Sequence, residues 1–210
     1  MIQVKICGIN DAEALDTAIA AGADWVGFVF FPPSPRFVTP ETAALLSARA
    51  GDGPPRVGLF VDPTETDIAH VLGHVRLDAL QIYGAAERVA AFRTRFGLPI
   101  WRAIGVSAPA DVPTTMLGAD RLLLEAKPPA GADRPGGNAT AFDWSVLADW
   151  KAPGPWMLAG GLNPANVARA IRETGATAVD VSSGVESRKG VKDPALIRAF
   201  IAAAKGAVSA

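Results

Sequence analysis

The chain has 210 residues, a single cysteine and a formal net charge of −1 at pH 7. One cysteine excludes an internal disulfide framework and is typical of a reducing compartment, while the near-zero charge gives no electrostatic reason to expect nucleic acid or a membrane as partner. No apolar run reaches the length of a membrane span, and the N-terminal segment lacks the long apolar core of a signal peptide. We therefore expect a cytoplasmic protein. Because no linker or change in composition divides residues 1–210, we also expect a single domain.

Short apolar segments alternate with segments of helical periodicity, which indicates repeated βα units and a parallel sheet. The predicted strands are Ile2–Cys7, Trp25–Phe31, Arg56–Val61, Ala79–Ile82, Ile100–Val106, Arg121–Glu125, Trp156–Leu158 and Ala178–Val181. The predicted helices are Asp11–Ala21, Pro40–Ala50, Pro63–Val75, Ala85–Phe96, Phe142–Trp150, Pro164–Thr174 and Pro194–Ala204, with a weak helix signal in Ser107–Leu117. The candidate N-caps are Asn10 or Asp11 for the first helix, and Thr39, Asp62 and Asp193 for later ones. Eight strands with about eight helices predict a single (β/α)8 barrel; an open doubly wound sheet is the alternative, but it usually has fewer strands.

The first predicted strand ends in the only cysteine of the chain, Cys7. The active site of a (β/α)8 barrel lies at the C-terminal ends of its strands, so this thiol is a candidate functional group. Asp11 begins a helix just after it, and Lys5 lies two residues before it on the same face of the strand; both features favour a lowered thiol pKa. The alternative is a small buried apolar residue.

Three further polar residues lie at or just beyond predicted strand ends. Arg36 follows three prolines within four residues, so a stiff loop would hold its guanidinium at the barrel mouth, where the planar fork suits a carboxylate. Glu125 ends an apolar run, and a buried carboxyl with a raised pKa suits proton donation. Asp180 could hydrogen-bond a ligand or hold loops in place. The alternatives are a solvated arginine and an ion pair at the strand end.

Two loops rich in glycine and serine follow the seventh and eighth predicted strands. Gly160 and Gly161 belong to the first loop, and Ser183 and Gly184 belong to the second. Loops at these positions often hold phosphate in such barrels, because glycine lets backbone N–H groups approach an anion. The sequence therefore predicts a barrel of the phosphate-binding type.

His70 and His74 have the i, i+4 spacing of some metal ligands. The acidic residue of a zinc-protease motif does not lie between them, and their helix belongs on the outside of the barrel. We therefore expect a structural role for them and no metal site.

These motifs together resemble those of the phosphoribosylanthranilate isomerase family, a barrel enzyme of tryptophan biosynthesis. The segments that carry the resemblance are Lys5-Ile6-Cys7-Gly8, Ser34-Pro35-Arg36, Phe142-Asp143-Trp144, Ala159 through Val167, Val179 through Glu186, and Gly190-Val191-Lys192-Asp193. Their order along most of the chain is far more specific than any one of them.

The resemblance implies a cofactor-free isomerisation, the Amadori rearrangement of N-(5-phosphoribosyl)anthranilate to the 1-deoxyribulose 5-phosphate. By this resemblance Cys7 is the general base, Arg36 holds the anthranilate carboxylate, and the two glycine loops hold the phosphate. The general acid comes from the end of the sixth strand, where this chain has Glu125. We assign Asp180 to substrate binding, and we expect a monomer.

The chain departs from the family pattern at three positions. It has Glu125 where the family usually has aspartate, Tyr83 where the family favours histidine, and Ala139 where the glycine-rich loop normally has glycine. These departures motivate two alternatives: a related phosphate-binding barrel with an altered substrate or impaired catalysis, and a binding protein without turnover. A metal-dependent epimerase is disfavoured because histidines are missing from the mouth. A bifunctional isomerase is disfavoured because the two half-barrels show no internal symmetry.

Overall fold

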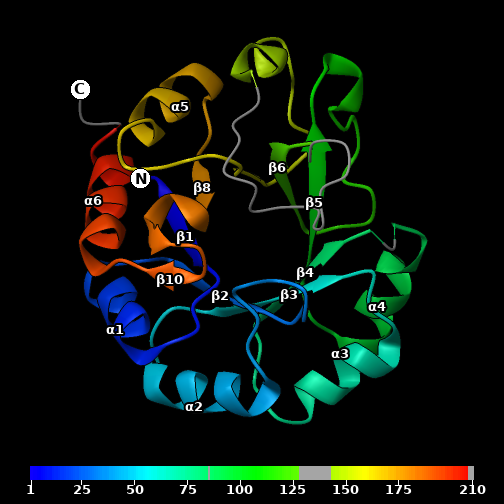
Figure 1. The fold of residues 1–210 in the computed structure, drawn as a ribbon. Helices are drawn as coiled ribbons and strands as arrows, with labels where there is room; N and C mark the ends of the chain where they lie inside the picture. The colour runs from blue at the N-terminus through cyan, green and yellow to red at the C-terminus, as the bar shows by residue number, and fades with distance from the viewer. Residues whose placement is uncertain (85, 128–142, 208–210) are drawn as a thin grey trace.

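Eight parallel strands form a closed barrel in the computed structural model, which describes residues 1–84, 86–127 and 143–207 (Figure 1). The strands are β1 (Gln3–Cys7), β2 (Trp25–Val29), β3 (Arg56–Val61), β4 (Ala79–Tyr83), β5 (Ile100–Val106), β6 (Arg121–Ala126), β7 (Trp156–Leu158) and β8 (Ala178–Val181). Each pairs with the next in the chain, and β8 pairs with β1 to close the sheet. The predicted (β/α)8 barrel is confirmed, and the open sheet is excluded.

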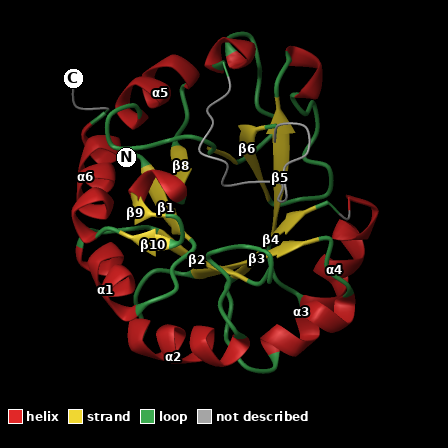
Figure 2. Cartoon of the chain, viewed as in Figure 1, coloured by secondary structure: helices red, strands yellow, loops and turns green. Residues whose placement is uncertain are grey.

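Helices surround this barrel on its outer side, as Figure 2 shows. The α-helices of the described residues are α1 (Ala12–Ala20), α2 (Pro40–Ala50), α3 (Glu65–Leu72), α4 (Val89–Phe96), α5 (Val167–Thr174) and α6 (Pro194–Gly206). The short 3₁₀ helices are η1 (Ala86–Arg88), η2 (Pro109–Asp111), η3 (Trp144–Leu147) and η4 (Ser183–Val185). Where the described part of the chain follows β5 and β6, single 3₁₀ turns replace two of the roughly eight expected helices. Prolines in the first of these segments remove the N–H donors that a longer helix requires.

Side chains that cap helix N-termini define where most helices begin. Asp11, Thr39 and Asp193 accept hydrogen bonds from backbone N–H groups of the first turn, as predicted. The predicted cap at Asp62 is wrong. Thr64 caps α3 instead, in a capping box in which Asp67 accepts a hydrogen bond from the Thr64 N–H at 2.8 Å.

Alternation of side chains along the strands separates two cores. Outward-facing residues such as Val4, Ile6 and Phe28 are fully buried in the main core. Toward the N-terminal ends of the strands, the barrel interior is filled by Val57, Ala79, Trp101, Leu123, Met157 and Ala178; the same cluster includes Ala159, which directly follows β7. At the opposite end a smaller cluster consists of Cys7, Val29, Leu59 and Tyr83. The interior of the barrel is therefore packed with side chains toward the N-terminal ends of the strands, which leaves the C-terminal ends as the place for a ligand.

Within the residues that the structure describes, no helix is both long and apolar enough to cross a membrane.

Candidate active site

The C-terminal ends of the strands surround a pocket of about 660 Å³, counting space open to solvent. Seven of the eight predicted site residues line it: Cys7, Arg36, Glu125, Gly160, Gly161, Asp180 and Ser183. The eighth, Gly184, follows Ser183 in the chain. Residues from β1, β6, β8 and the loops after β2, β7 and β8 therefore converge on one cavity of a size suited to a small molecule.

An ion pair beneath the pocket links β1 to β8. Lys5 and Asp180 are register partners, and the Lys5 Nζ donates to Asp180 Oδ1 at 2.8 Å. Gly27 on β2 leaves room for this layer, because a Cβ there would lie 3.0 Å from the Cys7 Sγ and 3.1 Å from the Lys5 Nζ. Asp180 therefore both lines the pocket and holds the lysine that lies beside the thiol.

Burial raises the pKa of the Cys7 thiol above its ordinary value. Lys5 and Lys192 act in the opposite direction but do not outweigh burial, and the Asp180 carboxylate adds to the increase. The expectation of a lowered pKa, drawn from the neighbouring lysine and helix, is therefore wrong. For Lys5, burial acts to lower the pKa, but Asp180 and Cys7 together raise it, so this lysine remains a cation.

We expect the Cys7 thiol to become reactive only at alkaline pH. Its alkylation rate by iodoacetamide should rise with pH to a midpoint above that of a free cysteine peptide, because a raised pKa delays thiolate formation. The signal is unambiguous because the chain has one cysteine. In Lys5→Met the midpoint should rise further, since the positive charge is lost. A wild-type midpoint below that of the peptide would contradict the argument from burial.

A second pair of polar side chains, from β6 and β4, lines the same pocket as the thiol. Glu125 is buried at the end of β6, and Tyr83 is buried at the end of β4. Burial, the charge of Glu125 and a hydrogen bond with Glu125 keep the pKa of Tyr83 well above its usual value. Tyr83 is thus a neutral hydroxyl that contacts the Glu125 carboxyl group, while Gln81 Nε2 lies 3.5 Å from the Tyr83 oxygen. The hydrogen bond between Tyr83 and Glu125 therefore orients the Glu125 side chain.

Arg36 is almost completely buried, with 4% of its surface exposed, so the alternative of a solvated arginine is excluded. Its aliphatic stem lies against Gly8, where a Cβ would be 2.8 Å from the Arg36 Cδ. Gly8 also has a φ of +74°, a conformation that favours glycine. The guanidinium makes a two-bond contact with Glu186, with Nε donating to Oε1 at 2.6 Å and Nη2 to Oε2 at 3.0 Å.

The two glycine loops touch each other at the pocket. Gly160 has a φ of +78°, and a Cβ there would lie 2.7 Å from the Ala126 backbone nitrogen. A Cβ at Gly184 would collide with the carbonyl oxygen of Leu162 in the neighbouring loop. Both positions therefore require glycine, for different reasons: conformation and close approach at one, close approach alone at the other.

Helix α5 begins three residues later than predicted, at Val167. The side chain of Asn163 accepts hydrogen bonds from the N–H groups of Ala165 and Asn166, at 2.9 and 3.2 Å, and so forms a turn before the helix. The second loop continues into the 3₁₀ helix η4. Both loops thus present irregular backbone to the pocket.

Four residues of the pocket region received no role from the sequence: Gln81, Tyr83, Glu186 and Lys192. Tyr83 stood out only as a departure from the family, and the last two only as members of longer motifs. The sequence placed Glu186 in the motif of the second glycine loop, but it did not show that Arg36 is buried and therefore needs an anion beside it.

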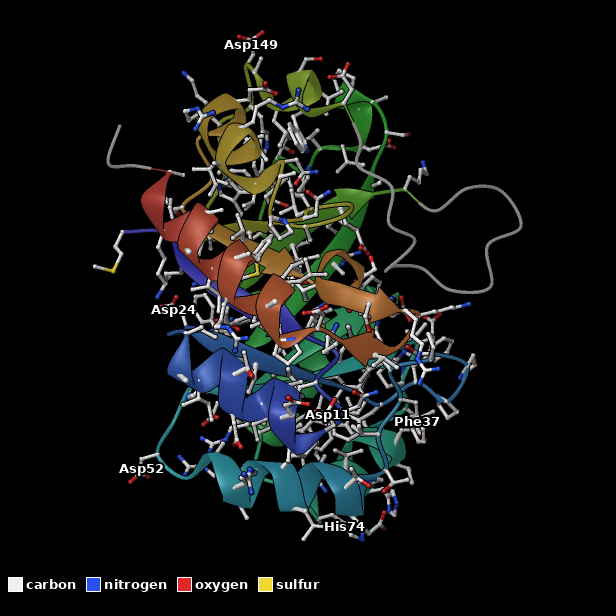
Figure 3. The ribbon with its side chains drawn as sticks, turned by 60° about the vertical axis from the view of Figure 1, so that its left-hand side comes forward. Asp11, Asp24, Phe37, Asp52, His74 and Asp149 are labelled. Atoms are coloured by element: carbon white, nitrogen blue, oxygen red, sulfur yellow. The ribbon has the colours of Figure 1, made fainter. Side chains whose placement is uncertain are left out.

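The paired histidines lie far from this pocket in the fold. His74 is at the outer edge of the molecule beside α2, where its Nε2 lies 3.8 Å from the Glu41 carboxylate (Figure 3). Its Nδ1 is 2.8 Å from the carbonyl oxygen of His70. Among the described residues, no group of three or more possible metal-binding side chains was found. Ala139 and Phe142 lie outside the described residues.

The fold and pocket define a (β/α)8-barrel enzyme that takes a small molecule at the C-terminal ends of its strands. A family model described as N-(5'-phosphoribosyl)anthranilate isomerase matches residues 4–203. The N-(5'-phosphoribosyl)anthranilate isomerase of Acidiphilium cryptum is 58% identical over 207 residues, which span 99% of this chain and 100% of that protein. The chain therefore belongs to the N-(5'-phosphoribosyl)anthranilate isomerase family, and the predicted isomerase of tryptophan biosynthesis is confirmed at that level.

Two solved structures support this membership. Monomers generated from the dimeric Thermotoga maritima enzyme are 37% identical, with a TM-score of 0.81 and coverage of 98% of this chain and 100% of that one. A family structure in complex with reduced 1-(o-carboxyphenylamino)-1-deoxyribulose 5-phosphate is 36% identical, with a TM-score of 0.82 and the same coverage. Our expectations of a monomer and of a cytoplasmic location stay predictions.

Proposed function

We propose that this chain catalyses the Amadori rearrangement of N-(5-phosphoribosyl)anthranilate to 1-(2-carboxyphenylamino)-1-deoxyribulose 5-phosphate. The observation that carries the proposal is the convergence of Cys7, Glu125 and Arg36 with the two glycine loops in one pocket. The reduced product analogue named in a relative's structure has a carboxylate at one end and a phosphate at the other, as the proposed substrate does.

The pocket offers a distinct surface to each part of this substrate. Arg36 would take the carboxylate, and the apolar side chains beside it would contact the aromatic ring. Those side chains are Val29, Phe31, Leu59 and Val61. At the other side, backbone N–H groups of Gly160, Gly161, Ser183 and Gly184 would meet the phosphate. The ribose then lies between Cys7 and Glu125.

Glu125 acts as the general acid in the first step. Its proton goes to the furanose ring oxygen, the bond from that oxygen to C1 breaks, and the nitrogen lone pair forms the C1=N bond of a Schiff base. Cys7 then removes the C2 proton, so the electron pair of the C–H bond forms the C1=C2 bond while the π pair of the C1=N bond returns to nitrogen. The resulting enolamine tautomerises to the ketone. The rearrangement oxidises C2 to a ketone and reduces C1 to an amine-bearing methylene within the same molecule, so the reaction needs no external oxidant or reductant.

The surroundings of the two groups support these roles. Lys5 and Lys192 favour the thiolate of Cys7 against the effect of burial. Tyr83 holds Glu125 through its hydroxyl. Asp180 lines the pocket, as its expected role in substrate binding requires, and its ion pair with Lys5 also supports the base.

We expect steady-state turnover when the wild-type chain is mixed with freshly generated phosphoribosylanthranilate, followed by the loss of its fluorescence. The control is the same chain saturated with the reduced product analogue, which should block the signal. If the analogue binds but substrate is not consumed, the chain is a binding protein and the proposal fails. If neither binds, the pocket serves another phosphorylated substrate.

A further inference from the structure

The side chain of Glu186 collects hydrogen bonds from several elements of the barrel mouth. Glu186 begins β9 (Glu186–Arg188), which forms a hairpin with β10 (Val191–Lys192) directly after η4. Only 4% of its side chain is exposed. Its two oxygens accept from Arg36 Nε at 2.6 Å and Nη2 at 3.0 Å, from Lys192 Nζ at 3.0 Å, and from the Gly190 N–H at 3.0 Å.

Through these hydrogen-bond partners, Glu186 is connected to the loops that follow β2, β8 and β1. Arg36 belongs to the loop after β2, and Lys192 also donates to the Ser182 carbonyl oxygen at 2.9 Å in the loop after β8. Gly190 accepts a hydrogen bond from Asn10 Nδ2 at 3.0 Å, which ties the hairpin to the loop after β1. Glu186 therefore connects the loop after β2, which carries Arg36, with the loop after β8, which carries Ser183 and Gly184.

The charges of this cluster favour an incoming anion. Burial alone would raise the pKa of Glu186, but Arg36, Lys192 and the Gly190 N–H together lower it, so the carboxylate stays ionised. One buried anion then lies between two buried cations, which leaves one positive charge in excess beside the pocket. Arg36 lines that pocket and Glu186 does not.

The guanidinium has five N–H donors in a fixed plane. Glu186 engages the edge that carries Nε and one N–H of Nη2. Of the three remaining N–H bonds, one on Nη1 and one on Nη2 form the outer edge of the plane. This edge fits a second carboxylate with two parallel hydrogen bonds. We infer that Glu186 is a positioning residue that fixes Arg36 in the orientation in which this outer edge selects ligands with a ring carboxylate. This inference rests on the proposed function, in which Arg36 binds that carboxylate.

The test measures whether Glu186 acts on the carboxylate in particular or on the whole pocket. Two ligands are compared by calorimetric titration: reduced 1-(o-carboxyphenylamino)-1-deoxyribulose 5-phosphate and the same compound prepared with aniline, which lacks the ring carboxylate. In Glu186→Gln, the amide keeps the size of the side chain but loses the charge and one acceptor. We expect affinity for the carboxylated ligand to fall about tenfold or more, and affinity for the other ligand to change less than about threefold.

A matched control is Glu173→Gln on α5. The Glu173 carboxylate is half exposed on the helix surface, and its Oε1 lies 3.6 Å from the Nε of Arg169. This control variant should leave both affinities unchanged. Glu186→Asp provides a second variant that keeps the charge but is too short to reach both Arg36 nitrogens, and it should show a smaller loss with the same ligand preference. In an Arg36→Lys background, Glu186→Gln should have no further effect on the preference, because lysine lacks the oriented fork.

Equal losses for both ligands would overturn the inference, since a merely structural hairpin would weaken phosphate and carboxylate binding alike. Unchanged affinity for both ligands would also overturn it. If the wild-type chain itself does not prefer the carboxylated ligand, the proposed function is contradicted. This outcome is distinct from failure of the inference about Glu186, because it is seen in the wild-type chain without any variant.

Discussion

Replacing Cys7 by alanine should lower kcat of the isomerisation by a factor of about 10² to 10⁴, the usual contribution of a positioned general base. The physical reason is that the alanine side chain carries no group that can accept the C2 proton. Affinity for the reduced product analogue should change less than about threefold, because the groups proposed to bind its carboxylate and phosphate are other residues of the pocket. Stopped-flow turnover and calorimetry measure the two quantities.

Cys7→Ser is the matched control for this experiment. The hydroxyl has nearly the size of the thiol but holds its proton far more tightly, so the serine variant should be almost as slow as the alanine variant. A serine variant with near wild-type turnover would mean that the side chain's volume matters and its acidity does not. An alanine variant that keeps more than about a tenth of the wild-type kcat would show that another residue is the base.

The barrel was predictable because alternation of apolar strands and helices repeats along the chain, and because strand ends converge in this fold. That convergence brought Cys7, Arg36 and Glu125 into one pocket although they are far apart in sequence. In the described residues after β5 and β6, the single 3₁₀ turns η2 and η3 stand where helices were expected, because apolar periodicity does not distinguish one helical turn from a longer helix.

Two electrostatic features could not be read from the sequence. The Glu186–Arg36 contact joins residues 150 positions apart, and a glutamate in a motif does not reveal which cation it meets. The direction of the Cys7 pKa shift was predicted wrongly because the sequence shows the nearby Lys5 but not the depth of burial, which is the larger effect. Neighbouring charges can be inferred along a strand, whereas desolvation depends on the whole fold.

Glu125→Gln should lower kcat by about 10² to 10⁴, because an amide cannot deliver the proton that opens the ribose ring. Glu125→Asp is the matched control: it keeps the acid but moves it by about one C–C bond and away from Tyr83, and misplacement of about 1 Å can cost about 10²-fold. The aspartate variant should therefore be slower than wild type and faster than the glutamine variant. An aspartate variant faster than wild type would instead mark this chain as a catalytically impaired relative.

Combining Glu125→Gln with Cys7→Ala tests whether the two groups serve successive steps. If the acid opens the ring before the base removes the C2 proton, each variant slows a different step, and the overall rate follows the slower one. The double variant should then be about as slow as the slower single variant, within a few-fold, because the slower step alone limits the rate. Multiplied losses would place both groups in one transition state, in which ring opening and proton removal occur together, and would contradict the stepwise mechanism proposed above.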